Sequence, residues 1–150
     1  ELGRLVTGEA GGGEELAGAK AEDFYTDPKE AEAFCKETGV DALAIAFGTA
    51  HGFYSAQPKL DFDVVKNCAK ATGLPLVMHG GSGVSPEDYK KAITCGVRKI
   101  NYYSYMARAG RNAVEEKLKE DVTFFHILAG VATDAMKEDA IKAMKVFVGL

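Results

Sequence analysis

The sequence predicts an α/β fold built on parallel strands. Three successive segments, at residues 27–47, 61–79 and 85–102, each combine a helix start, a glycine that ends the helix and a short apolar strand. The strands carry apolar residues without alternating polar ones, which is typical of parallel strands buried on both faces. Helices and strands that alternate in this way favour a parallel sheet covered by helices.

The first helix shows most clearly how these boundaries are encoded. Asp27 has the side chain of an N-cap, Pro28 suits the first helical position, and Gly39 suits a C-terminal stop. The apolar run at residues 42–47 follows as a strand. The same signals predict helices over residues 61–72 and 85–95, each ended by a glycine, with strands over residues 74–79 and 97–102.

Both ends of the chain depart from this pattern. Residues 1–5 resemble a short strand, whereas the glycine and glutamate-rich residues 6–20 predict a mobile loop that closes as a lid. Helices are expected over residues 105–120 and 134–148, with an apolar stretch between them; they either complete a barrel or pack against a neighbouring subunit. Because the chain begins with Glu1 rather than Met, we expect a fragment, a processed chain or an incomplete record.

Composition narrows the class of protein. The chain has 150 residues, 47% of them hydrophobic and 27% charged, with a net charge of −4, as expected for one globular domain with a real core. It lacks both an apolar run of about 20 residues and a signal-peptide pattern. Scattered basic residues in an acidic chain argue against nucleic acid as a partner. We expect a cytoplasmic protein without nucleic acid or membrane partners, whose three cysteines are reduced thiols.

Two histidines occupy equivalent places in the predicted units. His51 and His79 each follow an apolar run and precede a glycine. The ends of parallel strands are where α/β proteins keep their functional side chains. We interpret the pair as metal ligands or as catalytic groups, the alternative being hydrogen-bonded structural histidines. The third histidine, His126, lies in an apolar stretch and is interpreted as a packing residue.

The glycine-rich loop after His79 has the features of an anion site. Gly80 to Gly83 lead directly into a capped helix, so backbone N–H groups and the positive end of the helix dipole face the same ligand. A phosphate is the natural ligand, and Ser82 and Ser104 add hydroxyl groups. Asn101, at the end of the next strand, either binds a substrate oxygen or caps the strand.

Acidic residues near the N-terminus are further candidates. Glu1, Glu9, Glu14 and Glu15 each have the chemistry of a metal ligand or a mobile base, although most glutamates in such loops only keep them solvated.

Several motifs together resemble the second half of the class II, metal-dependent fructose-bisphosphate aldolases, a family that includes tagatose-bisphosphate aldolases. They are ELGRL, YTDP, GVDALAIAFGTAHG, LDF, LPLVMHGGSG and the KIN run to Ser104, within residues 1–104. The resemblance implies a (β/α)₈ barrel of which residues 1–150 supply roughly the second half. It also implies zinc ligands (His51, His79), an acidic residue near the metal (Glu1), a loop glutamate linked to proton transfer (Glu9), a phosphate site (Gly52, Gly80, Ser82, Ser104) and a substrate-binding amide (Asn101).

The resemblance further implies a function. It is the zinc-dependent, reversible cleavage of fructose 1,6-bisphosphate to dihydroxyacetone phosphate and glyceraldehyde 3-phosphate in glycolysis, with Na⁺ or K⁺ as a second cation. The alternatives are a tagatose-bisphosphate aldolase and a noncatalytic phosphate-binding or assembly module. We expect a homo-oligomer, a dimer or a tetramer. The family's further zinc histidine and an aspartate belong to the first half of its barrel, so these 150 residues should be inactive unless that half is supplied.

Overall fold

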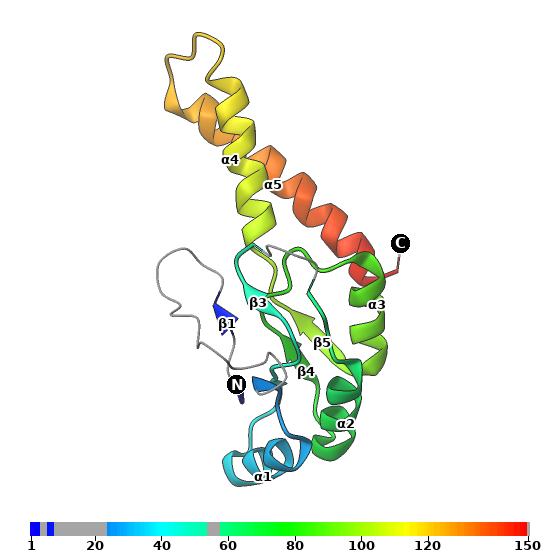
Figure 1. Cartoon of the computed structure of the whole chain (residues 1–150). Coiled ribbons are helices and arrows are strands. Elements are labelled where there is room, and N and C mark those ends of the chain that lie inside the picture. Colours follow the sequence, from blue (N-terminus) through cyan, green and yellow to red (C-terminus); the bar gives the residue numbers. More distant parts are fainter. Residues whose placement is uncertain (4–5, 8–23, 54–57, 150) are drawn as a thin grey trace. The chain divides into compact units, whose positions relative to one another are not determined.

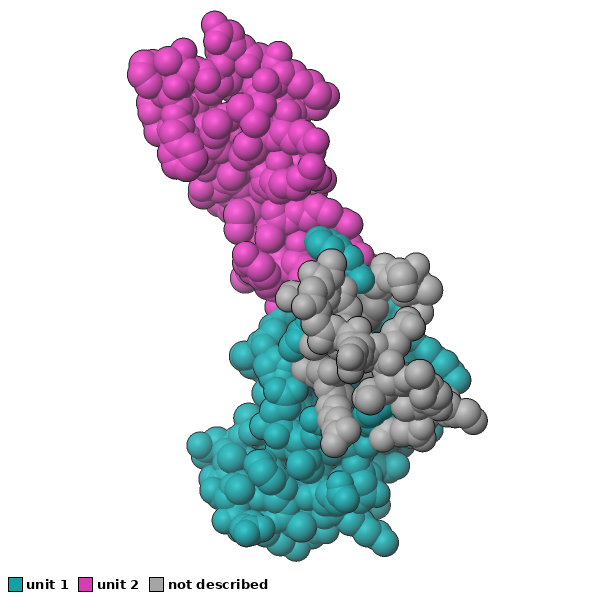
Figure 2. Space-filling view, turned by 60° about the vertical axis from the view of Figure 1, so that its left-hand side comes forward, with its two compact units in different colours: residues 1–101 teal, residues 102–150 magenta. Residues whose placement is uncertain are grey.

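The computed structural model describes residues 1–3, 6–7, 24–53 and 58–149, which form two compact units (Figures 1 and 2). Unit 1 comprises residues 1–101 and unit 2 residues 102–150. At the centre of unit 1 is a three-stranded sheet in the order β2-β4-β5. Its strands β2 (Leu43–Ala44), β4 (Leu76–Met78) and β5 (Val97–Ile100) are all parallel, which confirms the predicted parallel α/β arrangement.

Three helices accompany this sheet, and α2 and α3 lie along one side of β4 and β5 (Figure 1). The helices are α1 (Pro28–Thr38), α2 (Phe62–Thr72) and α3 (Pro86–Cys95). Each starts as the sequence predicts, because a side-chain oxygen of the preceding residue accepts hydrogen bonds from first-turn N–H groups. α1 and α2 end at glycines with φ of 66°, the left-handed conformation that favours glycine.

The core of unit 1 lies between these helices and the sheet. Its largest fully buried side chains come from the strands, the segment after β2, and α2. Burial of these side chains supplies the main driving force for folding of the unit. They are Phe47, Leu43, Ile45, Leu76, Met78, Val65, Val97 and Cys68.

The strand that carries His51 differs from the prediction. We expected His51 at the end of the 42–47 strand, but β3 (Ala50–His51) is a separate strand that pairs in parallel with β1 (Val6–Thr7). Gly48, with φ of +109°, turns the backbone after Phe47 and ends the first run. β1 also shows that the first two residues of the expected 6–20 loop form a strand, whereas residues 8–20 lie outside the described part.

Unit 2 is an antiparallel pair of helices, α4 (Ser104–Lys117) and α5 (Phe125–Phe147) (Figure 1). The expected helix start at residue 134 is wrong, because the apolar stretch before it belongs to the same 23-residue helix. That stretch contains no proline to break the helix, and its Gly130 is tolerated within it. Within the described residues, no helix has the length and apolarity needed to cross a membrane.

Close contact joins the two helices of unit 2. Gly110 of α4 is buried, and a Cβ at this position would lie 2.8 Å from Cγ of Met136 in α5, so a larger residue there would require the Met136 side chain to shift. The hydroxyl of Tyr102 donates to the Asp139 carboxylate at 2.6 Å. α5 nevertheless buries none of its residues completely. Large apolar side chains are exposed at Phe124, Phe125, Ile127, Ile141, Met144 and Val148.

Candidate metal and phosphate site

Two imidazole rings meet in unit 1. His79 directly follows β4, and His51 is the last residue of β3. Their ring centroids are 5.9 Å apart, and the rings are nearly perpendicular at 80°. The two histidines that the sequence singled out are therefore neighbours, although they belong to different small sheets.

Glu1 contributes a carboxylate to the same place. Its Oε2 lies 3.7 Å from Nε2 of His79, and both side chains are partly exposed. The backbone next to Glu1 is held to β2, because the Leu2 N–H donates to the Ala44 carbonyl at 2.9 Å. This backbone hydrogen bond holds the segment that carries Glu1 next to β2, with the Glu1 carboxylate beside His79.

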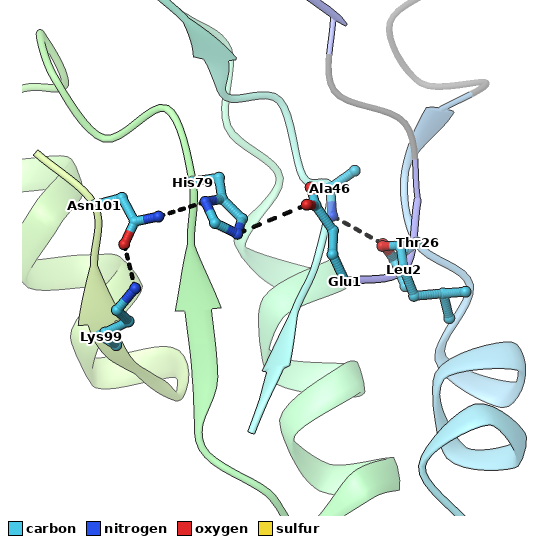
Figure 3. A network of polar contacts seen from close by, with 7 residues as sticks. All are labelled: Glu1, Leu2, Thr26, Ala46, His79, Lys99 and Asn101. Atoms are coloured by element: carbon cyan, nitrogen blue, oxygen red, sulfur yellow. Dashed lines mark hydrogen bonds and ion pairs between the residues drawn. The ribbon is translucent and has the colours of Figure 1, made fainter. Parts of the chain in front are cut away.

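A buried hydroxyl strengthens that attachment. Oγ1 of Thr26 donates to the Leu2 carbonyl and accepts from the Ala46 N–H, both at 2.8 Å (Figure 3). The Thr26 N–H also donates to the Ala46 carbonyl at 2.9 Å. One threonine thus joins the first residues of the chain to the segment that follows β2.

Asn101 contacts the other ring nitrogen of His79. Its Nδ2 lies 2.5 Å from Nδ1 of His79, and its Oδ1 accepts from Nζ of Lys99, also at 2.5 Å (Figure 3). Because a lysine ammonium only donates, it fixes the amide oxygen on its own side and directs the NH₂ group to His79. Nδ1 then accepts, and the proton of a neutral His79 ring is on Nε2, facing Glu1.

The glycine loop that follows His79 packs against β3, which carries His51, and against Asn101 after β5. Gly80 has φ of +60°, and a Cβ there would lie 2.3 Å from the Ala50 carbonyl oxygen. The Gly81 N–H donates to the Asn101 carbonyl at 3.2 Å. Ser82 is buried, with 4% of its surface exposed. The loop therefore lies beside β3 and the end of β5, where the sequence predicted an anion site.

The structure places the remaining predicted site residues in different parts of the chain, and some of them lie outside the described residues. Gly52 immediately follows His51 and has φ of +89°. Ser104 is the first residue of α4 in unit 2, rather than the end of a strand. Glu9, Glu14 and Glu15 lie outside the described residues. His126, interpreted as a packing residue, is instead exposed and stacks on the Phe124 ring with centroids 5.7 Å apart.

Sequence reasoning missed two residues of this network, Thr26 and Lys99, and one buried hydroxyl outside it, that of Thr49. In the sequence, Thr26 was noted only as part of the YTDP motif before α1. Lys99 had a detectable signal, because residues two apart in a strand share a face and Lys99 precedes Asn101 by two. Thr49 Oγ1 is buried and has no hydrogen-bond partner among the described residues. No local pattern in the sequence marks a hydroxyl of this kind.

The donor set agrees in kind with a divalent metal such as zinc, which binds imidazole nitrogen and carboxylate oxygen. His51, His79 and Glu1 supply two nitrogen ligands and one oxygen ligand. Within the described ranges, however, no group of three or more His, Cys, Asp or Glu residues is arranged to hold a metal ion. These three residues are thus not by themselves arranged as a metal site, and a metal bound there would require further ligands.

Comparisons with known proteins give a consistent result. The family model of class II fructose-bisphosphate aldolases matches residues 1–149. The uncharacterized protein YdjI of Escherichia coli K12 is 43% identical over 123 residues, which are 82% of this chain and 43% of YdjI.

Solved structures resemble the chain in fold as well. The crystal structure of the YdjI aldolase matches with a TM-score of 0.74 and 42% identity, covering 83% of this chain and 46% of that one. A protein from Coccidioides immitis, assigned as a fructose-1,6-bisphosphate aldolase, matches with a TM-score of 0.76 and 30% identity, covering 97% and 50%. The chain thus spans about half the length of these relatives.

Proposed function

The chain belongs to the class II fructose-bisphosphate aldolase family, and from this membership we propose that the protein cleaves a ketose 1,6-bisphosphate in a zinc-dependent, reversible aldol reaction. Fructose 1,6-bisphosphate is the proposed substrate, with dihydroxyacetone phosphate and glyceraldehyde 3-phosphate as products. Relatives assigned as fructose-bisphosphate aldolases support this choice of sugar. In this proposal the chain supplies about half of a (β/α)₈ barrel.

The proposal rests on one observation: side chains that can bind a metal lie next to a glycine loop of the kind that binds phosphate. His51 and His79 lie 5.9 Å apart between ring centroids, Glu1 lies 3.7 Å from His79, and the loop at Gly80 packs on the backbone of β3. A noncatalytic phosphate-binding module would need the loop but not the paired imidazoles. The combination therefore favours an enzyme over a binding module.

Each group has a distinct proposed role. His51, His79 and Glu1 hold the metal, and a zinc ion bound there supplies a Lewis acid for the substrate carbonyl. The loop around Gly80 and Ser82 binds the phosphate and orients the sugar. Asn101 donates to a substrate oxygen through the second N–H of its NH₂ group, since only one N–H is directed to Nδ1 of His79.

Four further roles are proposed on sequence grounds. Gly52 and Ser104 belong to the phosphate site, Glu9 moves the proton next to the carbonyl, and Na⁺ or K⁺ binds as a second cation. We also propose a homo-oligomer, either a dimer or a tetramer. The exposed apolar side chains of unit 2, with Phe125 80% and Val148 71% exposed, support that assembly because such surface is usually covered by a partner.

Metal content and cleavage rate, measured together on the full protein, test the function. The wild type should carry zinc and cleave fructose 1,6-bisphosphate, and chelation should abolish cleavage until zinc is restored. His79→Ala should lose most of both properties. His126→Ala is the matched control, because it removes an exposed imidazole in unit 2 and should leave both unchanged.

Two results would contradict the proposal. Full zinc content and full activity in His79→Ala would remove His79 from the metal site. A zinc-free wild-type protein that still binds phosphate would indicate the noncatalytic module instead.

A further inference from the structure

A buried tyrosine of α3 reaches the glycine loop. The hydroxyl of Tyr89 donates to the Gly81 carbonyl, and only 5% of the Tyr89 surface is exposed. The same carbonyl also accepts a longer bond from the Val84 N–H at 3.4 Å. The Gly81 carbonyl oxygen therefore attaches the loop to the body of α3.

The other side of Gly81 is held as well. Its N–H donates to the Asn101 carbonyl at 3.2 Å, and a Cβ on Gly81 would lie 2.7 Å from Cγ2 of Ile100 and 2.8 Å from the Asn101 oxygen. Gly81 is thus fixed between the end of β5 and α3. Its N–H and its C=O each have a defined partner.

This attachment determines the direction of the next amide. A peptide unit is planar, and this one is trans, so the Ser82 N–H points opposite to the Gly81 carbonyl. Because Tyr89 holds the carbonyl on the side of α3, the Ser82 N–H is directed to the other side of the loop. Gly81, the residue before this peptide, has the backbone freedom of glycine, and the bond from Tyr89 restricts that freedom.

We propose that Tyr89 is a positioning residue of the phosphate site: its hydroxyl holds the Gly81–Ser82 peptide in the orientation that presents the Ser82 N–H to a phosphate oxygen. The inference rests on the proposed phosphate-binding role of this loop. It adds a residue that does not itself touch the ligand and lies outside the predicted site. Preorganised donors bind an anion more tightly because little orientational freedom is lost on binding.

The test is a titration of the full chain with inorganic phosphate, followed through backbone amide NMR shifts. Tyr89→Phe keeps the ring and removes the hydroxyl. The matched control is Tyr25→Phe, which removes another Tyr hydroxyl that donates to a backbone carbonyl, that of Lys59 at 3.2 Å. We expect Tyr89→Phe to weaken phosphate binding about three- to tenfold, the typical effect of one neutral hydrogen bond, and Tyr25→Phe to leave it unchanged.

A second measurement does not depend on phosphate. The ¹³C shift of the Gly81 carbonyl reports whether it accepts a strong hydrogen bond, and it should move in Tyr89→Phe but not in Tyr25→Phe. An unchanged carbonyl shift, or equal phosphate affinity in Tyr89→Phe and wild type, overturns the inference while leaving the phosphate site intact. If wild type and Tyr25→Phe both fail to bind phosphate, the proposed phosphate site is wrong and the inference falls with it.

Discussion

Replacing Thr26 by valine tests how the N-terminal segment is held in place. Valine has nearly the shape of threonine but lacks the hydroxyl, so the change removes both side-chain hydrogen bonds, to the Leu2 carbonyl and from the Ala46 N–H, each 2.8 Å long. The site is dry, since Thr26 and Ala46 are each only 4% exposed. Water therefore cannot readily replace the lost partner of the Ala46 N–H.

The expected loss of stability follows from these two contacts. Leaving a buried N–H without a partner costs about 1–3 kcal/mol, and losing the bond to the Leu2 carbonyl costs about 0.5–1.5 kcal/mol more. Together these give about 1.5–4.5 kcal/mol, a large part of the roughly 5–15 kcal/mol that stabilises a typical domain. Thr26→Ser is the control, because it keeps the hydroxyl and removes one methyl group, which costs about 1 kcal/mol.

Urea unfolding followed by circular dichroism measures both variants. Thr26→Val should lower the free energy of unfolding by clearly more than Thr26→Ser, with an unchanged dependence on urea concentration. The reasoning is refuted if the valine variant is as stable as the serine variant, since the hydroxyl would then contribute nothing.

Two further predictions concern the core and the glycine loop. Burial, with smaller effects of Asp27 and Cys35, raises the pKa of the Cys68 thiol from 9.0 to about 11. Because the unfolded chain releases this proton at lower pH than the folded chain, the free energy of unfolding should fall between pH 9 and pH 11. This fall should be less steep in Cys68→Ala, which lacks the thiol. If the pH profiles of the two proteins are parallel, the prediction is wrong. Gly80→Ala should destabilise far more than Gly39→Ala in thermal unfolding. Both glycines have a similar left-handed φ, but only at Gly80 would the added Cβ lie close to a backbone atom, the Ala50 oxygen at 2.3 Å. If the two variants have equal melting temperatures, Gly80 and Ala50 do not approach each other so closely.

The sequence alone determined the repeating units of unit 1. Asp27, Ser85 and Gly39 act through bonds to residues a few positions away, so their effect on helix ends is local and can be predicted from the order of residues. The apolar strands likewise indicated a parallel sheet. The motifs around His51 and His79 pointed to the family that the comparisons then showed.

Only the tertiary structure decided which distant segments meet. β3 is a strand separate from β2 because it pairs with β1. The paired residues of β1 and β3 are 44 positions apart in the chain. Thr26 bonds to Leu2 and Ala46, which lie 24 and 20 positions away. Tyr89 bonds back to Gly81, across the start of its own helix. A hydroxyl has no fixed partner in a sequence, because its partner is set by the packing of whole helices and strands, and this is why the groups that position the site became visible only in the folded chain.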